Sequence, residues 1–131
     1  MLFLSNDLKD IMTRLGDGLP RSYGSHLLLK LYTGEAVYQG KEHNHQKSSI
    51  LIPDSVREEE IYQTIVGMVL DKGPDCYGGE MFTHWKQPKV GEWVLFRPNS
   101  GVRFNYDGVP LRFVYDDCVI CRVQNPALIR R

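Results

Sequence analysis

The first fifteen residues carry apolar side chains at helical spacing. These side chains recur three or four positions apart, at Leu4, Leu8, Ile11, Met12 and Leu15. Such spacing places them on one face of a helix, for which Ser5 or Asn6 is a suitable N-cap. Glycine and proline then interrupt the pattern over 16–24. We therefore expect residues 1–25 to form an N-terminal helical extension with a connector.

From His26 onward the pattern changes to one typical of β-strands. Strand-like stretches cover 27–32, 62–70, 92–97, 102–106, 109–115 and 119–123. The consecutive leucines of the first stretch predict burial on both faces, and Asp107-Gly108 suits a hairpin turn with positive φ angles. Short strands with regular turns predict an all-β domain over 26–131, folded as a small barrel or sandwich.

A long interval over 34–60 separates the first two strand-like stretches. Its first part is polar and has no sustained period, and it exceeds the length of an ordinary loop in a small domain. It leads into three large apolar residues, Ile50, Leu51 and Ile52, which Pro53 follows. Pro53 favours an extended backbone before it and cannot donate to a sheet. We expect an apolar segment on a mobile loop, although a buried edge strand is the alternative.

A second unusual interval covers 74–90. It contains the turn residues Gly78 and Gly79 together with bulky side chains, among them Tyr77, Phe82 and Trp85. Such a loop is too apolar to be a passive linker. We expect it to protrude or to pack against a neighbour.

Composition narrows the class of protein. The 131 residues suit one domain, and a formal net charge of +0 offers no basic surface for nucleic acid. No apolar run is long enough to span a membrane, and the amino terminus lacks the features of a signal peptide. Three cysteines are an odd and sparse set, which fits a reducing compartment. These features indicate a cytoplasmic protein that binds neither nucleic acid nor membrane.

Three motifs invite a chemical interpretation, and each has a simpler one. Cys118 and Cys121 have metal or redox spacing, but in a strand residues three apart point to opposite faces, so we expect at least one cysteine to pack in the core. His43 and His45 lack the further ligands of a zinc site. Asp116-Asp117 precedes a strand, where acidic residues commonly form turns. The sequence therefore predicts no enzyme, no metal site and no cofactor.

The order of these elements resembles the GroES-type co-chaperonin family over roughly 27–123. The motifs that carry the resemblance are Ser49-Ile50-Leu51-Ile52-Pro53-Asp54 after the polar interval, the strand and turn of 66–74, the strand of 89–96 and the closing stretch of 116–121. The chain departs from the family in its N-terminal extension and in Lys47-Ser48-Ser49, where the family often has two glycines. Irregular members of this kind are familiar from bacteriophages.

The resemblance implies a function as well as a fold. It implies a GroES-like β-barrel that assembles as a homo-oligomer, a heptameric ring that caps a bacterial or phage chaperonin of the GroEL type. Ile50, Leu51 and Ile52 match the docking tripeptide of the family's mobile loop. The interval 74–90, with Tyr77, Gly78, Gly79, Phe82 and Trp85, lies where the family has its roof hairpin.

Two other functions remain open. A small oligomeric barrel of a phage particle or another assembly could use the same surfaces for a fixed contact. A GroES-like barrel also occurs in zinc alcohol dehydrogenases, but this chain is too short for their nucleotide domain and lacks its glycine-rich fingerprint. Enzymatic activity is the least favoured of the three.

Overall fold

In the part of the chain that the structure describes, the regular structure consists of one short α-helix, six β-strands and three single 3-10 turns. The computed structural model describes residues 3, 5–33, 61–78 and 86–129. Along the chain lie α1 (Leu8–Leu15), η1 (Gly16–Gly18), β1 (His26–Leu31), β2 (Val66–Lys72), β3 (Trp93–Phe96), β4 (Val102–Tyr106), β5 (Val109–Tyr115), η3 (Asp116–Cys118), β6 (Val119–Val123) and η4 (Pro126–Leu128). The expected mostly-β fold with an N-terminal helix is confirmed.

The strands form one antiparallel sheet in the order β4-β5-β1-β2-β3-β6. The bounds of β4, β5 and β6 agree with the sequence pattern. Asp107 and Gly108 join β4 to β5 with φ angles of 52° and 82°, so the predicted hairpin turn with two positive φ angles is also confirmed.

The second strand begins later than its sequence pattern indicates. The prediction placed it at 62, whereas β2 starts at Val66. Ile61 and Tyr62 are helical, and the Thr64 amide donates to the Ile61 carbonyl oxygen at 3.0 Å. The β-branched residues before Val66 therefore belong to a turn, because the buried Ile61 side chain holds this segment against the core.

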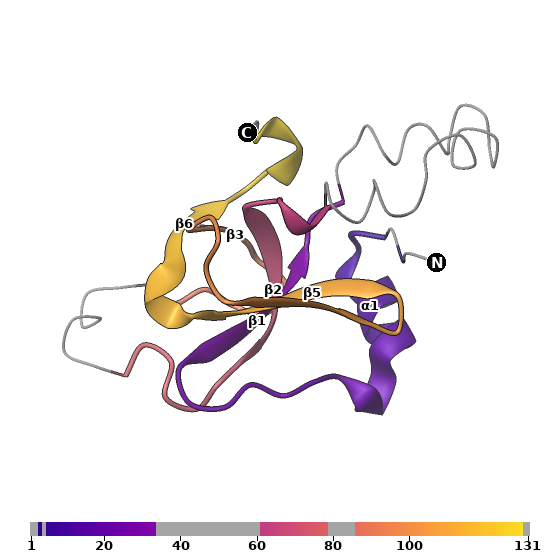
Figure 1. Cartoon of the computed structure of the whole chain (residues 1–131), viewed down its shortest axis with the longest axis horizontal. Coiled ribbons are helices and arrows are strands. Elements are labelled where there is room, and N and C mark those ends of the chain that lie inside the picture. Colours follow the sequence, from indigo (N-terminus) through magenta and orange to yellow (C-terminus); the bar gives the residue numbers. More distant parts are fainter. Residues whose placement is uncertain (1–2, 4, 34–60, 79–85, 130–131) are drawn as a thin grey trace.

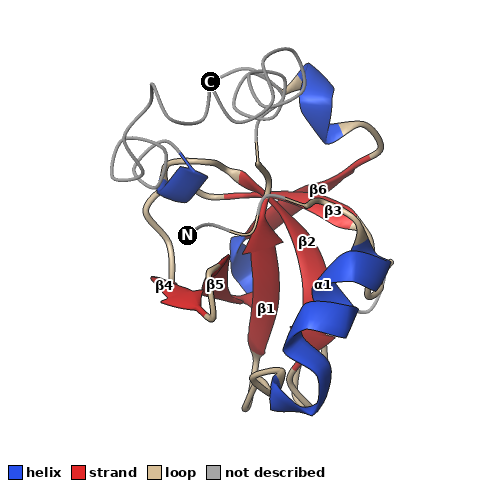
Figure 2. Ribbon diagram, turned by 90° about the vertical axis from the view of Figure 1, so that its right-hand side faces the viewer, coloured by secondary structure: helices blue, strands red, loops and turns tan. Residues whose placement is uncertain are grey.

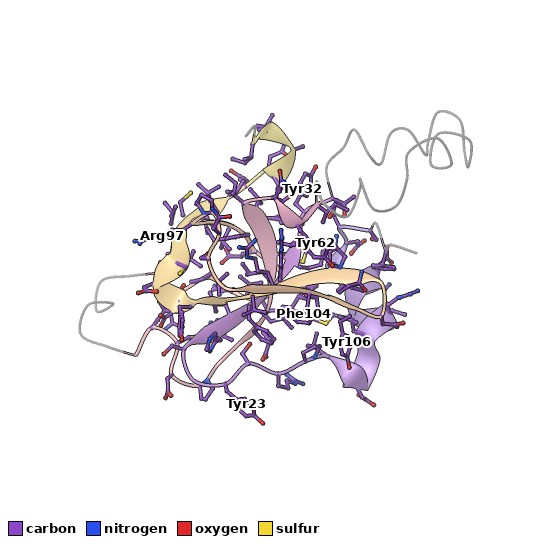
Figure 3. The ribbon with its side chains drawn as sticks, in the orientation of Figure 1. Tyr23, Tyr32, Tyr62, Arg97, Phe104 and Tyr106 are labelled. Carbon is purple, nitrogen blue, oxygen red and sulfur yellow. The ribbon has the colours of Figure 1, made fainter. Side chains whose placement is uncertain are left out.

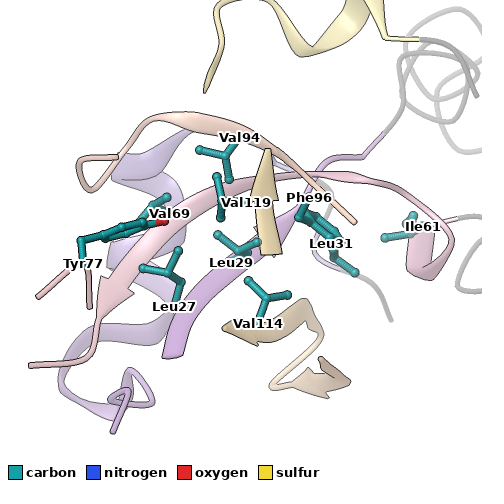
Figure 4. Close-up of a cluster of buried hydrophobic side chains, with 10 residues drawn as sticks. All are labelled: Leu27, Leu29, Leu31, Ile61, Val69, Tyr77, Val94, Phe96, Val114 and Val119. Carbon is teal, nitrogen blue, oxygen red and sulfur yellow. The ribbon is translucent and has the colours of Figure 1, made fainter. Parts of the chain in front are cut away.

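Each face of the sheet buries an apolar cluster, as the leucines of β1 predict. Leu27, Leu29 and Leu31 point to the first cluster, which Figure 4 shows with residues of β2, β3, β5 and β6 around it. Leu28 points to the opposite face and packs in the second cluster with Ile11 and Leu15 of α1. The helix therefore covers one face of the sheet (Figure 2).

The helix is shorter than its apolar spacing indicates. It begins at Leu8, and its N-cap is Asp7 rather than Ser5 or Asn6. The Asp7 carboxylate accepts a hydrogen bond from the Lys9 amide at 2.9 Å, whereas the side chain of Asn6 is used elsewhere. Before the helix, the Phe3 amide donates to the Gly108 carbonyl oxygen at 2.7 Å.

The described strands form an open sheet and not a closed barrel, because β4 and β6 are edges. The sheet is nevertheless strongly curled. Only Asp116–Cys118 connect β5 to β6, a step of at most ~14 Å. In a flat sheet these strands would lie four spacings apart, ~19 Å or more. The short connection therefore brings the two ends of the sheet towards each other.

Candidate functional site

Most of the residues expected to meet a partner lie outside the described part of the chain. Ile50, Leu51 and Ile52 fall in 34–60, and Gly79, Phe82 and Trp85 fall in 79–85. His43 and His45 lie outside it as well. Tyr77 and Gly78 are described, and so are the residues at which both intervals leave and rejoin the sheet. These junctions form the candidate site.

The two intervals depart from opposite ends of β2. Segment 34–60 lies between β1 and the turn that leads into β2, and 74–90 lies between the end of β2 and the start of β3. Since β1 and β3 each run antiparallel to β2, the junctions of the two intervals are separated along β2 by its length, about 20 Å. The junctions lie on different sides of the molecule in Figure 1.

The two ends of segment 34–60 lie next to each other. The Tyr32 amide donates to the Val66 carbonyl oxygen at 3.1 Å, and the Thr64 hydroxyl lies 3.5 Å from the Tyr32 carbonyl oxygen. Tyr32 and Tyr62 are labelled on the same side of the molecule in Figure 3, away from Tyr23. The chain therefore leaves the sheet and returns to it at one place.

The start of segment 34–60 is held by a buried polar cluster. Thr33 is buried, and its amide donates to Asn6 Oδ1 at 3.0 Å. Asn6 Nδ2 donates in return to the Thr33 carbonyl oxygen at 3.0 Å. One side-chain amide therefore pairs with both backbone groups of Thr33, in the manner of a neighbouring strand.

Lys30 completes this cluster from β1. Its side chain is fully buried, and Nζ donates to Asn6 Oδ1 at 3.0 Å and to Thr33 Oγ1 at 3.1 Å. Burial lowers the pKa of Lys30 from 10.5 to about 7, because desolvation disfavours the charged amine. Sequence reasoning missed this cluster, although a lysine in a run of leucines is a sign of a buried amine.

A polar cavity of about 250 Å³ lies beside the return of segment 34–60. Arg112 of β5 is buried here, with Nε donating to the Ser100 carbonyl oxygen at 2.6 Å. Its guanidinium also stacks on Phe96 at 5.2 Å, and that of Arg103 lies over the Tyr62 ring at 5.8 Å. These arginines tie the turn before β4 to the residues that lead into β2.

The start of the 74–90 interval is fastened to the connection between β5 and β6. Tyr77 lies in the core of its own chain, with only 5% of its surface exposed. Its amide donates to Asp116 Oδ2 at 2.8 Å, and its hydroxyl donates to the Asp116 carbonyl oxygen at 3.0 Å. Burial and the nearby Asp116 raise the pKa of Tyr77. Tyr77 therefore anchors this interval, while its φ of 59° turns the chain away from the sheet.

The aspartates and cysteines take the simpler roles that their positions predict. Asp116 and Asp117 lie in the single turn η3. Cys76 and Cys118 pack against the first core cluster, whereas Cys121 is exposed. Across the described ranges, no three histidine, cysteine, aspartate or glutamate side chains gather as metal ligands would.

The edge strand β6 presents apolar groups beside a second hollow. Ile120 is 56% exposed and Leu128 of the following segment is 75% exposed. Ile120 also lines a hollow of about 250 Å³, together with Val94, Val119 and Tyr77 among others. Within the part of the chain that is described, β6 pairs with β3 alone, so its other side can accept a further strand.

No described helix combines the length and the apolar character needed to cross a lipid bilayer. Neither the models of known protein families nor the curated proteins contain a match to this chain.

Proposed function

We propose that this chain is a co-chaperonin of the GroES type, which caps a chaperonin and encloses folding substrates during the partner's ATP cycle. The observation that carries the proposal is the departure of the two long intervals from opposite ends of β2. A cap needs a docking element at its rim and a covering element at its top. In this proposal segment 34–60 supplies the first and the 74–90 interval supplies the second.

The geometry at the start of each interval supports these roles. Segment 34–60 leaves and rejoins the sheet at one place, so its apolar tripeptide can reach outward from two fixed ends. The 74–90 interval is fixed by Tyr77 and Asp116. The strong curl of the sheet suits a GroES-like barrel.

The energetics of docking favour a ring of weak contacts. Burying Ile50, Leu51 and Ile52 is worth about 1.5 to 3 kcal/mol each, and ordering the chain around them offsets much of this. One loop therefore binds weakly. Several loops in a ring reinforce one another and still permit release when the partner changes shape. This function needs no nucleophile, metal or cofactor.

The test replaces Ile50, Leu51 and Ile52 by serine in one variant. We expect the barrel to stay folded while chaperonin binding in the presence of nucleotide falls by about 100-fold or more, because three buried side chains are lost at every loop. Binding is measured by co-sedimentation with a bacterial chaperonin, alongside its ATP turnover. The control replaces two exposed residues outside both intervals, Tyr23 and Val102, by serine and should bind normally.

Two results would contradict the proposal. If the unmodified chain does not bind a chaperonin, with or without nucleotide, the proposed co-chaperonin function is refuted. Loss of the fold in the triple-serine variant would place the tripeptide in the core instead.

A second candidate function is a fixed structural subunit of a phage particle or another assembly. The exposed edge of β6, with Ile120 and Leu128 beside it, favours assembly but does not specify the partner. A ring that forms normally and leaves chaperonin ATP turnover unchanged would favour this candidate.

A further inference from the structure

We propose that Asn6 is a positioning residue for the docking loop, through which the N-terminal extension holds the point where segment 34–60 leaves the sheet. This inference rests on the proposed function, because it assigns a role to that loop. The geometry it uses belongs to Asn6, Lys30 and Thr33, all of which are described.

The contact is built to replace a strand. Thr33 follows β1, and its backbone pairs with the Asn6 side-chain amide at 3.0 Å in both directions. The amide of Asn6 presents one donor and one acceptor side by side, which is the pattern that a peptide group offers to its neighbour in a sheet. Asn6 of the N-terminal extension therefore continues the backbone hydrogen bonding of β1 as far as Thr33.

The buried side chain of Lys30 fixes the position of the Asn6 side chain. Its Nζ donates to Asn6 Oδ1 and to Thr33 Oγ1, at 3.0 and 3.1 Å. Both acceptors and the amine lie in or beside a buried part of the molecule. Breaking one contact would leave buried polar groups without partners, so the three side chains hold or release Thr33 together.

The extension has an anchor that keeps Asn6 in place. Asn6 directly precedes Asp7, the N-cap of α1, and α1 is fixed to the sheet by the buried side chains of Ile11 and Leu15. A short segment therefore transmits the position of the helix to the start of the loop. Release of Thr33 would leave the start of segment 34–60 without a fixed position, and fixing it again on docking costs conformational entropy, which weakens binding at each loop.

The experiment compares Asn6→Ala with two other variants of the full chain. Hydrogen exchange at the Thr33 amide reports the contact directly, and nucleotide-dependent binding to a bacterial chaperonin reports its effect on docking. For Asn6→Ala we expect exchange at Thr33 to accelerate about tenfold and chaperonin affinity to fall about tenfold or more, since every loop of a ring is affected.

The controls separate the contact from helix stability. Asp7→Ala removes the N-cap hydrogen bond to Lys9 and leaves Asn6 intact, so it should alter Thr33 exchange less than twofold. Asn6→Asp keeps the acceptor contacts to the Thr33 amide and to Lys30 but loses the donor to the Thr33 carbonyl oxygen, so its Thr33 exchange should lie between that of Asn6→Ala and that of the unmodified chain.

The outcomes distinguish this inference from the proposed function. Unchanged Thr33 exchange in Asn6→Ala would overturn the inference, and so would faster exchange with unaltered chaperonin affinity. An equal effect of Asp7→Ala would assign the result to the helix and overturn it too. Absence of chaperonin binding by the unmodified chain would refute the proposed function and the docking role, while exchange would still decide whether Asn6 holds Thr33.

Discussion

The side chain of Lys30 shows how one residue responds to its position in the sheet. It lies on β1 between leucines, is fully buried and donates to two neutral oxygens. Desolvation is the cause of its lowered pKa, about 7. An amine of this kind carries less charge near neutral pH than a surface lysine does, and folding therefore becomes linked to protons at this residue.

Replacing Lys30 by methionine should change how stability depends on pH. Between pH 7 and 10.5 the unfolded chain binds a proton at Lys30 that the folded chain does not bind. The free energy of unfolding of the unmodified chain should therefore rise with pH over this range, by up to a few kcal/mol at about 1.4 kcal/mol per pKa unit. Lys30→Met should lose this rise in urea titrations.

The comparison is best made between pH 7 and 8.5. Burial raises the pKa of Cys76 and of Tyr77, so both groups lower stability at higher pH when they ionise in the unfolded chain. They are common to both proteins and cancel in the difference. If the free energy of unfolding depends on pH in the same way for Lys30→Met and for the unmodified chain, Lys30 is charged in the folded protein.

At the scale of elements, side chains fasten the long intervals to the sheet. The Asp116 carboxylate of η3 accepts a hydrogen bond from the Tyr77 amide. This bond joins the connection between β5 and β6 to the segment that follows β2. Asn6 does the same for the end of β1. Each contact uses a polar side chain to satisfy a backbone amide that has left the sheet.

Replacing Asp116 by alanine should loosen the start of the 74–90 interval. The buried Tyr77 amide would lose its acceptor, and a buried donor without a partner costs about 1 to 3 kcal/mol. We expect a lower midpoint of urea unfolding and faster hydrogen exchange at Tyr77. Asp117→Ala is the matched control, because the neighbouring Asp117 is exposed, and it should change stability by less than about 0.5 kcal/mol. Equal stability of the two variants would contradict the role given to Asp116.

For the whole molecule, the two sheet edges decide how copies can associate. Both edges expose apolar side chains, Val102 and Tyr106 on β4 and Ile120 on β6, but β4 also exposes Arg103, whereas Ile120 lines the apolar hollow. The charge of Arg122 on β6 is paired with Glu92 at 3.2 Å. The edge at β6 is therefore the better surface for a second copy, and Figure 1 shows η4 extending beyond it.

The proposed ring should depend on β6. Seven copies of the 15.1 kDa chain would form a particle of about 106 kDa, which light scattering coupled to gel filtration can measure. Ile120→Lys places a charge beside the edge, and we expect it to shift the particle towards monomers with an unchanged circular dichroism spectrum. Val102→Lys on β4 is the matched control and should leave the ring intact. If Val102→Lys dissociates the ring and Ile120→Lys does not, the interface between copies lies at β4 instead of β6.

Local sequence determined much of the fold. Alternation and turn residues located β4, β5 and β6, the Asp107-Gly108 turn and the helix, because each depends on neighbours along the chain. Consecutive leucines in β1 predicted burial on two faces. Apolar spacing could not locate the start of β2 or of the helix, since Ile61 packs in the core at the end of a helical turn and Asp7 takes the cap.

Only the tertiary structure decided the contacts between distant segments. Asn6 meets Thr33 because α1 packs on the sheet, and Tyr77 meets Asp116 because the chain after β2 lies against the connection between β5 and β6; neither contact follows from sequence spacing. The strand order left β4 and β6 as edges, whereas the sequence pattern indicated a barrel or a sandwich and the family resemblance implied a barrel. Side-chain pattern specifies which face of an element is buried, but pairing, curvature and the partners of buried polar groups depend on how all the elements pack at once.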